Sequence, residues 1–177
     1  EIQSVDIIFD THFWEHLWSI GKRYDDPFLQ GIIQRQVDIF NISTALRSYA
    51  MKRHRGFISA VLADNGTLPA KELLEAITTS LEVFVQYLQN TPYKHLINHS
   101  YEELLEKKTL NTFDLRKDNF LMGKLKEQKI VPFGPAAMIG YLYAKEIESK
   151  NLRIILIGKI NKVPEEILRS RVRDTYE

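Results

Sequence analysis

Apolar side chains recur along most of the chain at the spacing of an amphipathic helix. In the clearest run, Asp26 reads as an N-cap and Pro27 as the first helical residue. The apolar positions that follow keep close to a 3.6-residue period up to about Lys52; they are Leu29, Ile32, Ile33, Val37, Phe40, Leu46 and Tyr49. This pattern predicts one long helix that begins at Pro27.

Other segments of the first half carry the same signal. A helix is predicted from near Asp10 or Thr11 to a stop at Gly21, with an apolar stripe of Phe13, Trp14, Leu17 and Ile20. After a turn at Asp64-Asn65-Gly66, Pro69 is expected to open another helix. A further short helix is predicted from Leu81 to Leu88, closed by Asn90-Thr91-Pro92.

The second half is also predicted to be helical. Ser100-Tyr101-Glu102-Glu103 has the form of a capping box, and the helix behind it is expected to run to about Lys129, with a break near Asn111-Thr112 left open. A rigid loop at 132–135 precedes a helix from about Ala136 to Ile160, and Pro164 starts a short basic helix that ends near Tyr176. Residues 153–160 could form a strand on propensity alone, but the helical period on both sides favours a helix. The predicted fold class is therefore all-α.

Two of the predicted helices resemble each other. Residues 35–46 and 145–156 align with basic, apolar and acidic positions in the same order, and Asn41 matches Asn151 at a distance of 110 residues. The match predicts pseudo-repeated helical bundle domains, an incomplete first repeat over 1–66 and a second over 67–177. Because the chain begins at Glu1 without a methionine, we expect it to be a fragment.

Asparagine is a poor residue for a helix interior, since its amide competes for backbone hydrogen bonds. Its recurrence at Asn41 and Asn151 therefore indicates a specific buried hydrogen bond. A structural contact between packed helices is the favoured interpretation, and a functional contact is the alternative.

Composition removes several function classes. The chain has 177 residues, with 24 Lys plus Arg against 23 Asp plus Glu, so it lacks the basic excess typical of a nucleic-acid binder. Since cysteine is absent, a disulfide scaffold, a cysteine nucleophile and a thiolate metal site are excluded. The apolar runs are too short to span a bilayer, and the sequence predicts a soluble protein without a signal peptide.

An ordered pattern in the last third resembles the C-terminal signature of a family of stalk proteins, the C subunits of V-type/A-type rotary ATPases, which are equivalent to the d subunit in eukaryotes. Its most specific part is the string from Ala144 to Arg153. The residues that carry the resemblance also include Gly134, Pro135, Tyr141, Gly158-Lys159, Pro164-Glu165, Ile167, Arg169, Arg171 and Tyr176. The earlier string from Val37 to Ile42, followed by Leu46-Arg47, resembles the family's equivalent helix in the preceding domain. From these two matches we take the family-signature residues to be Asn41, Glu148, Asn151, Arg153 and Lys159.

The resemblance implies a non-catalytic role. Family members form a funnel of three pseudo-symmetric helical domains that sits on the cytoplasmic side of the membrane. They link the axle subunits of the central stalk to the proteolipid ring and transmit torque for ATP-coupled proton or sodium transport. By this resemblance the chain would have no active site of its own, no cofactor, no metal and no bound nucleic acid. It would be a peripheral part of the complex. The absence of a Walker A loop agrees with a member of the ATPase that does not bind nucleotide.

Two further features have plainer interpretations beside their functional ones. The arginines of the predicted final helix, Arg169, Arg171 and Arg173, could form a docking surface. The favoured interpretation is a solvated helix end whose cations offset the helix dipole. The segment from His12 to His16, with Glu15 between them, matches the H-x-x-E-H pattern of zinc peptidases. An ordinary amphipathic helix explains that segment as well, and a generic helical interaction module is a third alternative.

Overall fold

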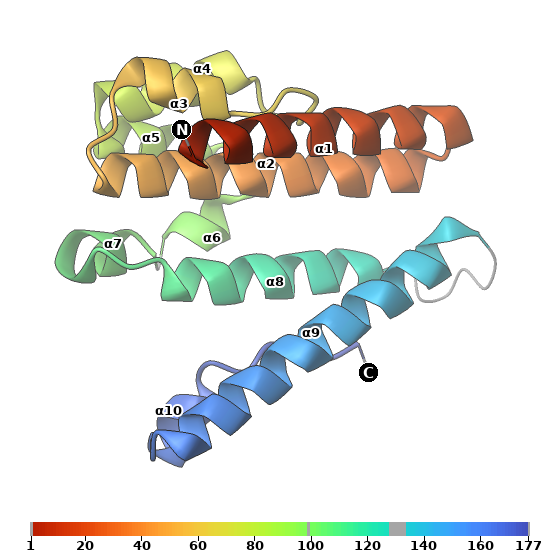
Figure 1. Ribbon diagram of the computed structural model, residues 1–177, viewed down its shortest axis with the longest axis vertical. Helices are drawn as coiled ribbons and strands as arrows, with labels where there is room; N and C mark the ends of the chain where they lie inside the picture. The colour runs from red at the N-terminus through yellow and green to blue at the C-terminus, as the bar shows by residue number, and fades with distance from the viewer. Residues whose placement is uncertain (1, 99, 128–133, 177) are drawn as a thin grey trace. The chain divides into compact units, whose positions relative to one another are not determined.

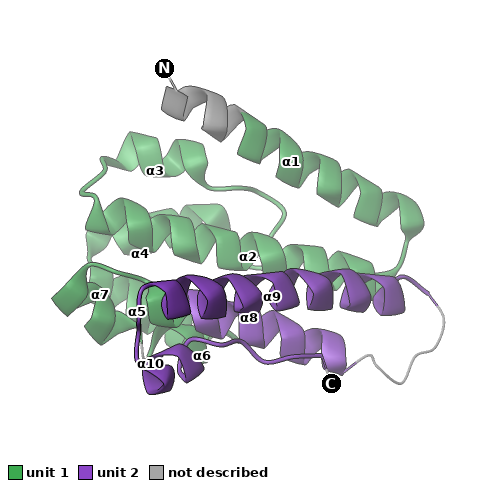
Figure 2. Ribbon diagram, turned by 60° about the horizontal axis from the view of Figure 1, so that its bottom comes forward, with its two compact units in different colours: residues 1–113 green, residues 114–177 purple. Residues whose placement is uncertain are grey.

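The computed structural model describes residues 2–98, 100–127 and 134–176, with side chains from residue 9 onward. Every element in these ranges is a helix, as Figure 1 shows, so the predicted all-α class is confirmed. Residues 153–160 lie inside a helix, which overturns the strand alternative for this segment. The chain divides into two compact units, residues 1–113 and 114–177 (Figure 2).

Unit 1 opens with two long helices that pack against each other, α1 (Ile2–Tyr24) and α2 (Pro27–Ala50). The predicted N-cap is confirmed, because Asp26 Oδ1 accepts a hydrogen bond from the Leu29 amide at 2.8 Å. The predicted start and stop of the first helix are wrong, since α1 begins at Ile2 and continues through Gly21. A Cβ on Gly21 would lie 2.8 Å from Cδ1 of Ile33, so this glycine permits close packing of α1 on α2.

Shorter helices and the start of α8 complete the described part of unit 1. They are α3 (Arg55–Val61), α4 (Ala70–Thr79), α5 (Leu81–Gln89), α6 (Lys94–Ile97), α7 (Tyr101–Lys107) and α8 (Asn111–Lys126). The sequence predicted α4 and α5, and Ser80 between them caps α5 by accepting from the Val83 amide at 3.2 Å. The core of the unit is apolar and includes Ile33, Val37, Ile42, Leu46, Leu73, Ile77, Leu81, Phe84, Leu88 and Ile97.

The predicted capping box at Ser100 does not form. The Ser100 hydroxyl instead donates to the carbonyl of Leu96 at 2.6 Å. Glu103 accepts from the Thr112 amide at 2.8 Å and so caps the start of α8. The helix expected here is broken after Lys107, at Lys108, which has a left-handed φ of 56°. It resumes as α8 at Asn111, where the sequence leaves a break open.

Unit 2 is built around α9 (Pro135–Ile160), whose bounds agree with the predicted helix. The end of the expected loop at 132–135 reaches the described residues at Gly134, and the rest of it lies outside them. The helix α10 (Glu165–Arg169) then packs back on α9. The prediction that the last helix runs to Tyr176 is wrong, because 171–176 is not helical.

Asp118 of α8 joins the segments of unit 2. Its carboxylate accepts from the ammonium of Lys150 at 3.2 Å and from Nε of Arg173 at 3.0 Å. Burial alone would lower the pKa of Lys150, but its hydrogen bond to Glu146 and the charge of Asp118 hold that pKa above 10.5. The segment after α10 is therefore tied by charge to α8.

Candidate functional site

Asn41 in the middle of α2 holds the loop after α3. Its amide nitrogen donates to the carbonyl of Ala63 at 2.8 Å, and its amide oxygen accepts from the amide of the same residue at 2.8 Å. Asn41 is fully buried. A single side chain thus satisfies both backbone polar groups of one buried loop residue, which would otherwise cost free energy.

Asn151 makes the same two bonds in unit 2. Its amide nitrogen donates to the carbonyl of Arg173 at 3.0 Å, and its oxygen accepts from the Arg173 amide at 2.9 Å. In both units the asparagine and the residue it holds are 22 positions apart. Asn41 and Asn151 therefore occupy the same structural place, as the sequence match predicted.

The helix ends correspond as well. Helices α2 and α9 end at Ala50 and Ile160, and the lysines two positions later, Lys52 and Lys162, both have a φ of 54°. The amide that closes each end donates to a carbonyl five residues back, Arg53 to Ser48 and Val163 to Gly158, both at 2.9 Å. All these pairs are separated by the same 110 residues. The predicted repeat bounds, 1–66 and 67–177, stay a prediction. The boundary between the two compact units lies at a different place, after Phe113.

Asp38 and Glu148 match at the same offset of 110 residues, but their surroundings differ. Asp38 is buried, and it accepts from the Leu68 amide at 2.9 Å, from the Tyr93 hydroxyl at 2.7 Å and from Thr67. Burial and the charge of Asp38 raise the pKa of Tyr93. Glu148, the equivalent in unit 2, is exposed and accepts from the Lys145 ammonium at 2.7 Å.

The exposed side of α9 carries three of the family-signature residues, Glu148, Arg153 and Lys159. Apolar side chains lie on the same helix and are also exposed, and they include Met138, Tyr141, Leu142, Leu152, Leu156, Ile157 and Ile160. A helix of a monomer normally buries such residues, so this surface is a candidate contact site.

The three arginines proposed as a docking surface do not share a helix. Arg169 lies in α10 and pairs with Glu165, and both side chains are exposed. Arg171 is exposed beyond the end of α10. Arg173 turns inward, with a side chain only 15% exposed and paired with Asp118. A role for Arg169 and Arg171 in docking stays a prediction, while Arg173 stabilises its own unit.

The zinc-peptidase pattern lies on the exposed side of α1. Nδ1 of His12 is 3.8 Å from Oε2 of Glu15, and both side chains are well exposed to solvent. Among the described residues, no group of three or more His, Cys, Asp or Glu side chains is placed to hold a metal ion. The pattern therefore has no third ligand in this part of the chain.

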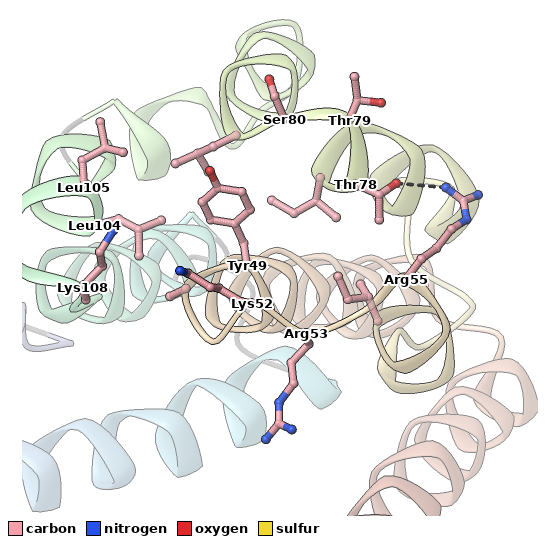
Figure 3. Close-up of a pocket in the computed structure, with 14 residues that line it drawn as sticks. Tyr49, Lys52, Arg53, Arg55, Thr78, Thr79, Ser80, Leu104, Leu105 and Lys108 are labelled. Atoms are coloured by element: carbon pink, nitrogen blue, oxygen red, sulfur yellow. Dashed lines mark hydrogen bonds between the residues drawn. The ribbon is translucent and has the colours of Figure 1, made fainter.

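Unit 1 also has a pocket of about 540 Å³ between the end of α2 and helices α3, α4, α5 and α7. Its apolar wall includes Ile58, Ile77, Leu81 and Leu104, and its cationic lining residues are Lys52, Arg53, Arg55 and Lys108. Figure 3 shows Arg55 reaching Thr78, to which it donates at 2.9 Å, and Arg53 turned away from the pocket. The remaining lysines give the pocket a positive rim.

The comparisons with known proteins agree with these features. A model of the family described as "ATP synthase (C/AC39) subunit" matches residues 1–171. The chain belongs to this family. The C subunit of the V-type sodium ATPase of Enterococcus hirae is 32% identical over 176 residues, which cover 99% of this chain and 53% of that protein.

Archaeal members of the family are similar to the chain at a comparable level. The C subunit of the A-type ATP synthase of Methanocaldococcus jannaschii is 33% identical over 96% of this chain and 44% of its own length. The corresponding protein of Methanococcoides burtonii is 28% identical over 85% of this chain. The chain thus spans about half the length of the curated relatives it matches. No solved structure matches it significantly.

None of the described helices is both long enough and apolar enough to cross a membrane.

Proposed function

We propose that this C/AC39 family chain is part of a non-catalytic adapter in the central stalk of a V-type or A-type rotary ATPase. The adapter links the axle subunits to the membrane proteolipid ring and transmits torque for ATP-coupled proton or sodium transport. The observation that carries this proposal is the family match over residues 1–171. The names of the relatives, which are parts of a sodium ATPase and of ATP synthases, support it.

Features of the described surface fit such a role. An adapter needs partner surfaces more than it needs a cleft for chemistry, and α9 exposes apolar side chains beside charged ones. The rigid asparagine contacts within each unit would let a unit pass on force without opening. We place the chain at the cytoplasmic face of the membrane, as a peripheral component. The repeated contacts also support pseudo-repeated domains of a larger, funnel-shaped subunit.

The test is to purify the whole subunit that carries this chain together with the axle subunits and the proteolipid ring. We expect it to stay with both through size-exclusion chromatography. Removal of the subunit is expected to abolish ion transport while the catalytic head continues to hydrolyse ATP, because torque no longer reaches the ring. If the subunit binds neither partner, or if its removal abolishes hydrolysis by the isolated head, the adapter role is wrong.

A further inference from the structure

The pocket between the end of α2 and helices α3, α4, α5 and α7 lies wholly inside unit 1. Its lining residues fall in three stretches, 49–58, 77–81 and 104–108. Its volume of about 540 Å³ lies in the range of sites that hold small organic molecules. What the pocket accepts depends on the chemistry of this lining.

Much of the pocket wall is apolar. Ile77, Leu81 and Leu104 are almost fully buried and belong to the core as well as to the wall. Tyr49 and Leu105 line the same pocket but are 38% and 43% exposed, so part of its apolar surface is open to solvent. Open apolar surface favours a ligand with an apolar body, because binding removes that surface from water.

The charged residues of the lining all have the same sign, since four cations line the pocket and no carboxylate does. Arg55 donates to Thr78, and Arg53 turns away from the pocket (Figure 3). The cations that remain are Lys52 and Lys108. Neither lysine forms an ion pair with a residue that the structure describes. An anionic group in the pocket would therefore meet positive charge that no described residue compensates.

The two lysines also share an unusual backbone conformation. Lys52 lies just beyond α2 and Lys108 caps the end of α7, with left-handed φ values of 54° and 56°. Glycine is the usual residue at such a helix end, since a Cβ strains this conformation. In Figure 3 both ammonium groups lie on the same side of the Tyr49 ring. Two helix ends thus each carry a strained cation at one pocket, a feature typical of ligand sites.

We propose that this pocket binds a small organic phosphate. The phosphate group pairs with Lys52 and Lys108. The apolar body of the ligand packs against Tyr49, Leu104 and Leu105. A phosphate monoester carries a charge of about −1.5 to −2 at neutral pH and so matches two ammonium groups, whereas a carboxylate matches one. This inference goes beyond the proposed function and does not depend on it.

The experiment uses the whole purified subunit and isothermal titration calorimetry. The probe is naphthyl phosphate, which joins a phosphate group to an apolar body. Inorganic phosphate and naphthol are titrated separately as the two halves of the probe. Sedimentation with phosphatidylglycerol vesicles measures whether the lysines bind the headgroups of a lipid surface instead.

The variants separate the charge of the pocket from its wall. Lys52→Gln and Lys108→Gln each remove one cation, and Lys162→Gln is their matched control, because Lys162 has the same φ of 54° and does not line the pocket. Leu105→Asp places a carboxylate in the wall. Its control is Val83→Asp, since Val83 is 40% exposed and lies outside the lining. The melting temperature of each variant without ligand shows whether it folds.

We expect naphthyl phosphate to bind with a dissociation constant below about 1 mM, a level that a ligand of its size supports. Each half of the probe should bind at least about tenfold more weakly. Lys52→Gln and Lys108→Gln should each weaken binding by about tenfold, the size of one charged hydrogen bond. Leu105→Asp should weaken it at least as much, because the new carboxylate repels the phosphate. Lys162→Gln and Val83→Asp should leave the affinity unchanged.

Four results would overturn the inference. They are no binding of naphthyl phosphate by the whole subunit, naphthol bound as tightly as naphthyl phosphate, unchanged affinity in either pocket-lysine variant, and binding to the vesicles alone. The first result includes the case in which other residues of the whole subunit fill the pocket. Co-purification with the axle subunits and the proteolipid ring tests the adapter role separately, so either conclusion can fail without the other.

Discussion

Asn151 holds Arg173 through both of its amide atoms, at 3.0 and 2.9 Å, as Asn41 holds Ala63 in the other unit. In each case the side chain lies in the middle of the longest helix of its unit and the bound residue lies in an irregular segment. Such segments have no regular backbone partners, so one asparagine replaces the bonds that a helix would supply. The repeated geometry explains why asparagine recurs at a position that disfavours it.

The first prediction concerns these asparagines. Asn41→Ala should lower the free energy of unfolding by about 2–4 kcal/mol, because it breaks two hydrogen bonds and leaves two buried backbone groups unpaired. Asn151→Ala should act in the same direction on unit 2. Amide hydrogen exchange checks the cause, since protection of the Ala63 amide should be lost in the first variant and that of the Arg173 amide in the second.

The matched control is Asn161→Ala, because the Asn161 side chain is exposed and donates to the Ile157 carbonyl one turn back in its own helix. It should change the stability little and leave both exchange signals intact. If Asn41→Ala leaves the Ala63 amide protected, that contact does not hold the loop.

The sequence predicted the long elements of the fold better than the short ones. The bounds of α2 and α9 followed from many apolar positions at helical spacing and, for α2, from the N-cap Asp26 and the proline after it. Helices α3 and α6 have 7 and 4 residues, too few to show a period. The local pattern predicts a stop at Gly21 because glycine often ends helices. In the structure this residue lies inside α1. A Cβ added to it would lie 2.8 Å from Ile33, so glycine is used here for close packing, a tertiary contact that no local pattern reports.

Some features of the candidate site could also be predicted from the sequence, and others could not. The match of Asn41 with Asn151 could be found in the sequence because both lie in similar strings. The inward orientation of Arg173 could not be predicted from the sequence, since its partner Asp118 is 55 residues away. The exposure of Leu152 and Leu156 could not be predicted either, because their matches on α2 are equally apolar and fully buried.

The second prediction concerns Gly66, which packs against the carboxylate of Asp38. A Cβ at this position would collide with Oδ1 of Asp38, a buried atom that also accepts from the Leu68 amide. Gly66→Ala should therefore cost about 2–3 kcal/mol of stability, as overpacking of a buried site does. Urea unfolding of the variant and of the wild-type chain measures this difference in the free energy of unfolding.

Gly123→Ala is the control, since a Cβ there meets nothing within 4 Å inside helix α8. Alanine is a better helix former than glycine, so this variant should gain up to about 1 kcal/mol. Equal effects at the two glycines would show that the approach of Gly66 to Asp38 is not tight.

The third prediction uses the matched lysines that follow α2 and α9. Lys52 and Lys162 share a left-handed φ of 54°, which strains any residue with a Cβ. Lys52→Gly and Lys162→Gly should each raise the free energy of unfolding by about 0.5–1 kcal/mol. Lys159→Gly removes the same charge from inside α9, and it should instead lower the stability by about 1 kcal/mol. If Lys52→Gly or Lys162→Gly lowers the stability, the left-handed backbone at that position is not strained by the lysine.

The fourth prediction concerns alkaline pH. Burial and nearby carboxylates raise the pKa values of Tyr93 and Tyr143 above 10.0. Both tyrosines therefore stay neutral in the folded chain at a pH where they ionise in the unfolded chain. Their contribution to stability is complete below pH 10 and is lost as the pH rises, by about 1.4 kcal/mol per pH unit for each tyrosine.

Urea unfolding between pH 9 and 11.5 measures this slope. Tyr93→Phe should be less stable than wild type at pH 8, because the bond from its hydroxyl to Asp38 is lost. Its stability should also fall less steeply above pH 10, by about 1.4 kcal/mol per pH unit. A slope equal to that of wild type would show that Tyr93 ionises normally in the folded chain.

The last prediction separates the arginines of the C-terminal segment by their surroundings. Arg173→Met leaves Asp118, whose side chain is 5% exposed, with Lys150 as its remaining cationic partner, so unfolding should become easier by about 3 kcal/mol. Arg169→Met breaks an exposed pair with Glu165 and should change the stability little. Adding Asp118→Asn to Arg173→Met should restore much of the loss, since the buried carboxylate that has lost one of its two cations is then gone. If the double variant is as unstable as Arg173→Met, the loss comes from packing of the arginine stem rather than from its charge.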